Sequence, residues 1–175
     1  MRIISGKYKG KILKGFNIEG TRPTMDRVKE SIFATIQIYI KNSTCLDLFA
    51  GSGSFGIEAL SNGARYAYFV DNSAQIQKVL KENLKGIDNY TLIQDDYKGA
   101  LNKFKNEEIK FDIIFLDPPY KLNLLNESIN LIEKFNLLKE NGIIICEYEF
   151  DTVNTSLNVF KTKKYGNKKV IILKK

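Results

Sequence analysis

Short β-rich apolar runs alternate with helical patterns along the middle of this 175-residue chain. The alternation is typical of an α/β protein, in which helices cover both faces of a parallel sheet. Apolar side chains recur at helical spacing between residues 76 and 84, behind an expected cap at Ser73, and again between residues 125 and 132. Asn62-Gly63 indicates the end of another helix. The expected strands cover residues 44–48, 66–70, 90–94, 111–116 and 143–148.

The two ends of the chain add hairpin patterns to this core. Gly166-Asn167 separates the β-rich runs 160–165 and 168–173, which predicts a C-terminal antiparallel hairpin. Residues 2–13 have an alternating character and predict a small basic hairpin, followed by a loop through residues 21–24 and a helix over 26–39. We therefore expect one domain over residues 1–175, with 1–24 as the basic hairpin and loop and 25–175 as the core.

Composition narrows the kinds of chemistry available to the chain. Hydrophobic residues make up 43% and charged residues 27%, as in ordinary globular proteins. The amino terminus lacks the apolar stretch of a signal peptide or spanning helix, so we expect a cytoplasmic protein without membrane contact. The chain has no histidine, and Cys45 and Cys146 lie in separate apolar runs. We expect buried, reduced cysteines and no metal, and the usual Cys/His and Ser/His catalytic arrangements are excluded.

The formal net charge of +7 is concentrated at the two ends of the chain. Residues 1–30 carry eight cations and three acids, and residues 161–175 carry seven lysines and no acid, so the middle is acidic. Basic ends indicate a bound polyanion, because neutralising phosphates releases counterions. The simpler alternative is that the lysines only keep the protein soluble. The expected RNA-binding residues are the amino-terminal cations Arg2, Lys7, Lys9, Lys11 and Arg27.

A glycine-rich turn opens a helix directly after the first strand, in residues 47–56. Glycines at this place let a ligand approach the backbone. Asp71 ends the next strand, 20 residues beyond Gly51, where a carboxylate can accept hydrogen bonds from ribose hydroxyls. Asp95 and Asp96 end the third strand, and either could meet an adenine edge. Since ligands of open α/β sheets bind outside the carboxyl ends of the strands, these loops predict one adenosine-shaped site.

Asp47 helps to distinguish between two ligands that the glycine turn would bind equally well. Its negative charge would repel the pyrophosphate of a dinucleotide but suits the ammonium of a methionine moiety, which favours S-adenosylmethionine. Asp47, Asp71 and Asp96 could instead be helix caps or turn formers. The residues of these loops that we expect to bind the cofactor are Asp47, Ala50, Gly51, Ser52, Gly53, Asp71, Asn72 and Asp96.

Asp117-Pro118-Pro119-Tyr120 follows the strand 111–116 and is the most specific motif of the chain. Two successive prolines fix φ and remove both amide donors, which leaves rigid carbonyls. A planar amino group could donate one proton to the Asp117 carboxylate and another to the Pro118 carbonyl while Tyr120 stacks on the ring. These bonds would hold the nitrogen for in-line attack on a sulfonium methyl group, mainly through proximity and orientation. We predict these four residues to be catalytic; whether Asp117 or water takes the released proton stays open.

Four segments together give the chain a family resemblance. Residues 2–11, 21–33, 47–56 and 115–120 read RIISGKYKGK, TRPTMDRVKESIF, DLFAGSGSFG and FLDPPY. Together they resemble the bacterial RsmD family, the 16S rRNA guanine-N2 methyltransferases. The resemblance spans essentially the whole chain, and its Arg-Pro-Thr block is more specific than the glycine turn.

The resemblance implies a class I methyltransferase fold: a Rossmann-like, seven-stranded, mostly parallel sheet with S-adenosyl-L-methionine as cofactor. It also implies transfer to N2 of a guanine in 16S rRNA, within the small ribosomal subunit or an assembly intermediate, by a protein expected to be a monomer. By the family pattern, Arg22 and Thr24 would close over the cofactor. Ser54-Phe55 departs from the commoner small-then-leucine pair, so contacts from those two side chains are not carried over. The target base must leave its stack, which predicts a bulge or loop nucleotide.

Three alternatives remain beside this interpretation. A dinucleotide-dependent oxidoreductase explains the glycine turn but gives the Asp-Pro-Pro-Tyr motif no task. A non-catalytic RNA-binding module explains the basic ends but not an adenosine site. An adenine-N6 or cytosine-N4 methyltransferase acting on DNA or RNA fits the Asp-Pro-Pro-Tyr motif equally well, because only the family resemblance indicates guanine as the target base. The absence of a separate target-recognition domain counts against a sequence-specific DNA enzyme.

Overall fold

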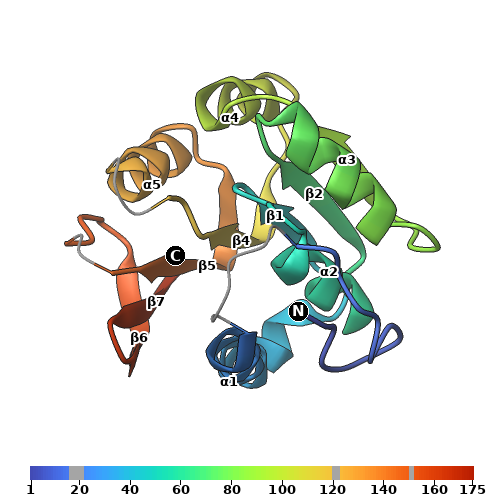
Figure 1. Cartoon of the computed structure of the whole chain (residues 1–175). Coiled ribbons are helices and arrows are strands. Elements are labelled where there is room, and N and C mark those ends of the chain that lie inside the picture. Colours follow the sequence, from blue (N-terminus) through green and yellow to red (C-terminus); the bar gives the residue numbers. More distant parts are fainter. Residues whose placement is uncertain (16–21, 120–122, 150–151) are drawn as a thin grey trace.

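A single mixed sheet organises the protein (Figure 1). The computed structural model describes residues 1–15, 22–119, 123–149 and 152–175, with the backbone alone for 22–25. The described residues form a seven-stranded sheet of order β3-β2-β1-β4-β5-β7-β6. Neighbours among the first five strands pair in parallel, and β7 is antiparallel to both β5 and β6. The strands are β1 (Thr44–Asp47), β2 (Tyr66–Val70), β3 (Tyr90–Ile93), β4 (Phe111–Leu116), β5 (Leu138–Tyr148), β6 (Asn158–Tyr165) and β7 (Lys168–Lys174).

This sheet confirms the expected α/β fold with its C-terminal hairpin. Gly166, with φ of 61°, lies in the turn between β6 and β7, as the sequence predicted. β5 begins five residues earlier than predicted, at Leu138. The extension arises because Leu138 pairs with Phe111 before an irregularity that shifts the register ahead of Ile113.

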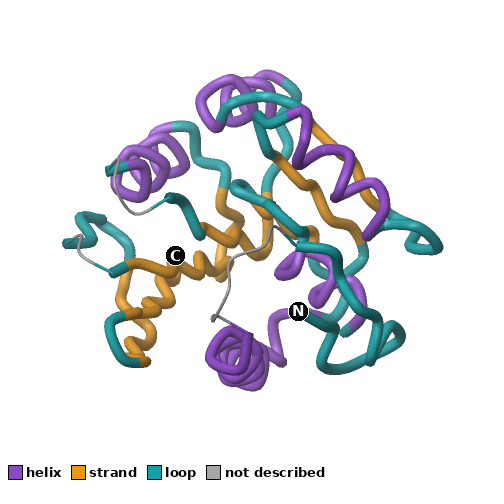
Figure 2. The backbone as a smooth tube through the Cα atoms, viewed as in Figure 1, coloured by secondary structure: helices purple, strands orange, loops and turns teal. Residues whose placement is uncertain are grey.

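Helices cover both faces of the sheet (Figures 1 and 2). Side chains of successive strand residues point to opposite faces, so Cys45 and Leu46 belong to two different hydrophobic clusters. The first cluster packs α1, α2 and α3 on one face, and the second packs α4 and α5 on the other. None of the helices in the described ranges is long and apolar enough to cross a membrane. The helices are α1 (Arg22–Ile40), α2 (Ser54–Ser61), α3 (Ala74–Asn83), α4 (Tyr97–Asn106) and α5 (Leu124–Lys134).

Two helices differ from the sequence predictions. α1 begins at Arg22, so Arg22, Pro23 and Thr24 lie in its first turn and not in the predicted loop. A proline is tolerated there because the first amides of a helix have no intrahelical acceptor. α4 was not predicted at all; it buries Leu101 and Phe104 and is capped by Asp96.

The predicted amino-terminal hairpin is present in minimal form within residues 1–15. Arg2 and Ile12 form one isolated antiparallel bridge, beside which the Ile3 N–H donates to the Lys11 carbonyl at 2.9 Å and the Leu13 N–H to the Met1 carbonyl at 3.0 Å. A longer ladder does not form because part of its backbone pairs with α2. The Ile4 N–H donates to the Glu58 carboxylate at 2.9 Å, and the Ser5 N–H donates to the same group at 2.9 Å.

Gly6 shows how closely this segment approaches α2. Its φ is +78°, and an added Cβ would lie 1.9 Å from the Ser61 carbonyl oxygen. The next amide, of Lys7, donates to that same oxygen at 2.8 Å. The segment is therefore docked along α2, where it can form part of a site.

Candidate active site

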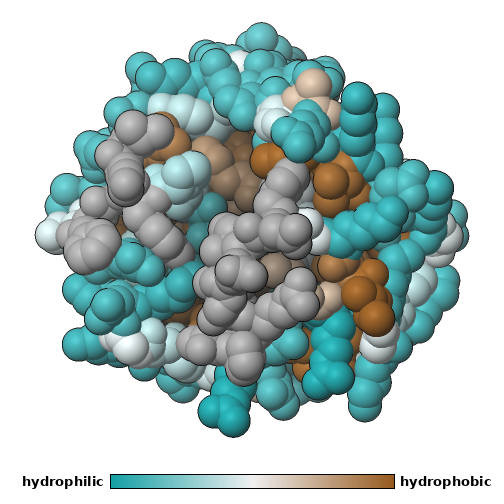
Figure 3. Space-filling model, viewed as in Figure 1, coloured by the Kyte–Doolittle hydropathy of each residue, from teal (hydrophilic) through white to brown (hydrophobic). Residues whose placement is uncertain are grey.

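A cavity of about 830 Å³ opens at the carboxyl ends of the parallel strands. Figure 3 shows apolar surface, in brown, recessed between hydrophilic surroundings on the side seen in Figure 1. The size lies within the range of small-molecule sites. The sequence-predicted site residues that line it are Ala50, Gly51, Ser52, Asp71, Asn72, Asp96, Asp117, Pro118 and Pro119.

The glycine turn and Asp71 form one hydrogen-bonded unit at this cavity. The Asp71 carboxylate follows β2 and accepts hydrogen bonds from the N–H groups of Gly51 and Ser73, each at 3.1 Å. Gly51 has a φ of 51°, and the Ala50 N–H donates to the Val70 carbonyl at 2.9 Å. Because an ionised carboxylate offers about four acceptor positions, Asp71 can bind ligand hydroxyls as well as the turn.

Asp47 lies beneath the turn. Its side chain is 3% exposed and accepts a hydrogen bond from the Gly56 N–H at 3.0 Å. Burial, together with the nearby charge of Asp71, raises the pKa of Asp47 to about 7, although the Gly56 hydrogen bond opposes this shift. Among the described residues, neither Asp47 nor Gly53 lines the cavity. The cofactor contacts expected of these two residues stay predictions.

Asp95 and Asp96 both line the cavity after β3. Asp96 also caps α4, since its carboxylate accepts from the Gly99 N–H at 2.8 Å. Tyr97 lies next to them and packs on Phe49, with ring centroids 5.8 Å apart. Both rings line the cavity, and the sequence predictions had missed them.

The Asp-Pro-Pro segment follows β4 and lines the same cavity as the glycine turn. Asp117, the buried Pro118 and the exposed Pro119 all contribute to it. Tyr120 lies outside the described residues. For Arg22 and Thr24 the structure describes the backbone in α1 but not the side chains. The glycine turn and the Asp117 segment therefore belong to one crevice, as the chemistry predicted from the sequence requires.

A charged group beside Asp117 was not predicted. Glu147 and Glu149, at the end of β5, and Lys168, at the start of β7, all line the cavity. The Lys168 ammonium donates to the Glu147 carboxylate. Burial alone lowers the pKa of Lys168, but the Glu147 hydrogen bond and the charges of Glu147, Asp117 and Glu149 outweigh it, so the pKa lies above its usual value. One feature of the sequence could have indicated Glu147 and Glu149: both acids lie where a strand ends, at the edge of the sheet where ligands bind.

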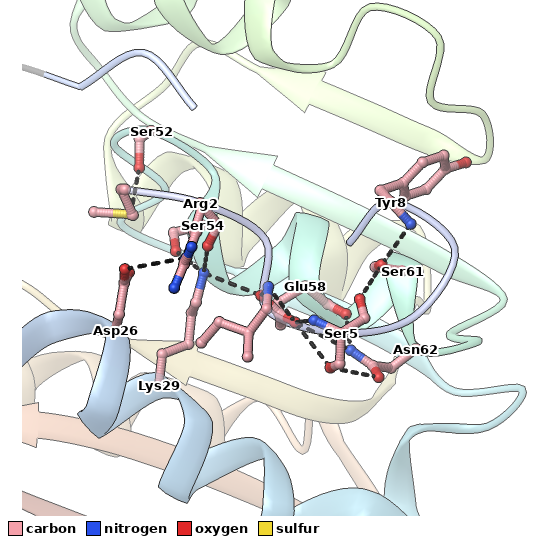
Figure 4. Close-up of polar contacts among 12 residues, drawn as sticks. Arg2, Ser5, Tyr8, Asp26, Lys29, Ser52, Ser54, Glu58, Ser61 and Asn62 are labelled. Atoms are coloured by element: carbon pink, nitrogen blue, oxygen red, sulfur yellow. Dashed lines mark hydrogen bonds and ion pairs between the residues drawn. The ribbon is translucent and has the colours of Figure 1, made fainter. Parts of the chain in front are cut away.

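A buried ion pair connects the amino-terminal segment to the cavity (Figure 4). The Lys29 ammonium lies 3.0 Å from the Glu58 carboxylate and donates to the Arg2 carbonyl at 2.7 Å and the Ser54 hydroxyl at 3.1 Å. Lys29 and Met1 both line the cavity. The docked segment therefore forms one of its walls.

The predicted RNA-binding cations lie at the surface around this segment. Arg2, Lys7, Lys9 and Arg27 are exposed, and the Arg2 guanidinium is 3.9 Å from the Asp26 carboxylate. Lys11 is partly buried, and its ammonium donates to the Lys85 carbonyl at 2.6 Å. Among the described residues, none of the five lines the cavity, so any role they have lies outside it.

The family described as "Conserved hypothetical protein 95" matches residues 1–174. This chain belongs to that family. A Haemophilus influenzae protein named "Ribosomal RNA small subunit methyltransferase D" is 41% identical over 155 residues, which cover 86% of this chain and 80% of the relative. The membership in the RsmD family that the sequence suggested is thus confirmed.

Solved structures confirm the fold. The Escherichia coli protein YhhF has a TM-score of 0.87 at 31% identity, with 100% of this chain and 97% of that chain covered. The Thermus thermophilus 16S rRNA guanine-N2 methyltransferase RsmC, solved with AdoMet and guanosine, has a TM-score of 0.71 at 19% identity. The match covers 91% of this chain and 45% of that one, and it shows a shared Rossmann-like fold alone.

Proposed function

We propose that this family member is an S-adenosylmethionine-dependent methyltransferase that modifies N2 of a guanine in 16S rRNA. One observation carries the proposal: a single cavity is lined by the glycine turn with Asp71 and by Asp117 and Pro118. A site that transfers a group between two bound molecules needs both sets of residues within one crevice. The names of the family relatives support ribosomal RNA of the small subunit as the substrate.

The residues of the cavity fit the proposed cofactor. Asp71 offers a carboxylate for ribose hydroxyls, while Phe49, Ile76 and Tyr97 offer apolar surface for an adenine ring. Asp95 and Asp96 lie beside them for the amino edge of the base. When bound, S-adenosylmethionine supplies an electrophilic methyl group. Asp47 would either position the glycine turn, which it holds by a hydrogen bond, or bind the ammonium group of the methionine moiety.

Asp117 and Pro118 would orient the substrate amine. The Pro118 carbonyl and the Asp117 carboxylate can each accept one N–H of a planar amino group, which turns the nitrogen lone pair away from the ring. Tyr120 is proposed to stack on the base. Orientation accounts for most of the rate, and the proton that the nitrogen releases passes to Asp117 or to water.

The surface cations would hold the RNA around the extruded base. We propose that Arg2, Lys7, Lys9, Lys11 and Arg27 neutralise phosphates of an assembled or assembling small subunit, which a monomer in the cytoplasm would reach. Replacing Lys7 and Lys9 by glutamine should weaken binding and reduce its salt dependence by about one unit of slope per lost phosphate contact. An unchanged slope would remove these residues from the interface.

The test is methyl transfer from labelled S-adenosylmethionine to unmodified small subunits, with the product nucleoside identified by mass spectrometry. We expect N2-methylguanosine. Asp117→Ala should lower kcat by about 100-fold or more while leaving the Kd for cofactor unchanged. A methylated adenine or cytosine, or full activity of Asp117→Ala, would overturn the proposal.

A further inference from the structure

Three charged side chains stand in a row on neighbouring strands of the cavity. Leu116 and Cys146 are partners in the β4–β5 register, so Asp117 and Glu147 are the next residues on two strands about 4.8 Å apart. β7 lies on the other side of β5, and its first residue is Lys168. The order of the strands across the sheet is therefore Asp117, Glu147, Lys168. The register pairs Val170 with Glu147, so Lys168 lies opposite Glu149 and its side chain reaches back to the Glu147 carboxylate.

These three side chains point to the same face of the sheet. The residues two positions away on the same strands are Phe115, Ile145 and Val170, and all three belong to the hydrophobic cluster that packs under α1. Because strand side chains alternate between faces, the charged residues share that face. They also all line the cavity, so the row faces the space that a substrate would occupy.

The last two members of the row form an ion pair of limited exposure. The Lys168 ammonium donates to the Glu147 carboxylate, and the two side chains are 25% and 7% exposed. Burial lowers the pKa of Lys168, but the Glu147 hydrogen bond and the charges of Glu147, Asp117 and Glu149 raise it above its usual value, so the ammonium stays protonated. The row thus offers two acceptors followed by one donor.

We propose that Glu147 and Lys168 are specificity-determining residues that select guanine by its Watson–Crick edge, an inference that rests on the proposed function. Beside its N2 amine, guanine carries the N1–H donor and then the O6 acceptor. With N2 held at Asp117, the N1–H donates to the Glu147 carboxylate and O6 accepts from the Lys168 ammonium. Each ring position then meets a complementary group.

The other bases with an exocyclic amine do not match this row. Adenine held by N6 presents its N1 acceptor to Glu147, and cytosine held by N4 presents its N3 acceptor there. Two acceptors facing each other repel and leave the ring nitrogen without a donor in a partly buried site, which is a basis for rejection. The row therefore separates guanine from the two bases that the Asp-Pro-Pro clamp alone would accept.

The test compares two nucleosides in the presence of S-adenosylhomocysteine. Guanosine carries the full edge, whereas 2-aminopurine riboside keeps the N2 amine but lacks N1–H and O6. The Kd of each is measured by calorimetry or NMR for the wild type, Lys168→Met and Lys168→Arg. Lys164→Met, in the same hairpin but exposed on β6, is the matched control.

We expect the wild type to prefer guanosine by roughly tenfold or more, as charge-assisted hydrogen bonds allow. Lys168→Met should lose the part of that preference that comes from O6, by weakening guanosine binding alone, because the Glu147 contact with N1–H remains. Lys168→Arg should keep most of the preference, and Lys164→Met should change nothing. On small subunits, Lys168→Met should lower kcat/KM roughly tenfold with the Kd for cofactor unchanged.

The ion pair could instead serve only to tie β7 to β5. In that case Lys168→Met would lower thermal stability while the ratio of the two Kd values and kcat/KM per folded protein stayed at wild-type values, which would overturn the inference. Failure of the proposed function is a separate result, namely that the wild type forms no N2-methylguanosine on subunits.

Discussion

The buried ion pair between Lys29 and Glu58 leads to a prediction that can be given a magnitude. The ammonium lies 3.0 Å from the carboxylate, and the two side chains are 4% and 0% exposed. Glu58→Gln would leave the Lys29 charge buried without its counter-charge. Breaking such a pair costs about 3–5 kcal/mol. Lys29 would keep its bonds to the Arg2 carbonyl and the Ser54 hydroxyl, but the glutamine NH2 would replace one of the two oxygens that accept the Ile4 and Ser5 amides. We therefore expect a loss within that range, about 3–5 kcal/mol in the free energy of unfolding.

Urea unfolding followed by circular dichroism measures this cost. Glu82→Gln is the matched control, because Glu82 pairs with Lys85 at 2.8 Å but both side chains are largely exposed. The control should leave the midpoint unchanged. Replacing both partners, as in Lys29→Met with Glu58→Gln, should recover part of the lost stability because no charge stays buried. If Glu58→Gln behaves like the control, or the double variant is no more stable than the single one, the reasoning from burial is wrong.

Three further predictions concern single positions. Burial raises the pKa of Asp47 to about 7 from its ordinary 3.8, so between these pH values the folded state holds a proton that the unfolded state has lost, and the protein loses stability as pH rises through them. The difference in unfolding free energy between Asp47→Asn and wild type, measured in paired urea titrations, should therefore favour the variant more at pH 8 than at pH 5. Gly6→Ala should lower the melting temperature clearly more than Gly10→Ala, since both have positive φ but only Gly6 meets backbone within 4 Å; equal shifts would contradict the docking of this segment. Burial raises the pKa of Cys45 to about 12 and that of Cys146 further still, so neither thiol should react with a disulfide reagent until urea unfolds the protein.

The alternation of apolar runs was sufficient to predict the sheet, because a strand buried on both faces needs a continuous apolar run. The four strands β1 to β4 were each predicted to within one residue. α4 was missed because its buried face consists of few residues, among them Leu101 and Phe104, in an otherwise polar segment. Hydrophobic periodicity is weak over so short a helix.

The residue types of the glycine turn, Asp71 and the Asp-Pro-Pro segment could be found in the sequence because each directly follows a strand. The carboxyl ends of parallel strands lie at one edge, so the chain order alone predicts that these loops meet. The same logic placed Asp96 at the cavity, where it also caps α4.

Tertiary structure decided what chain order does not encode. The sequence places Lys29 and Glu58 in different helices and Glu147 and Lys168 in different strands, and only packing brings each pair together. The amino-terminal hairpin stays short and docks on α2 because Glu58 accepts hydrogen bonds from its amides, a contact across 54 residues that no local pattern predicts. Local patterns report the preferences of neighbouring residues, whereas the walls of this cavity come from side chains that only the folded sheet makes neighbours.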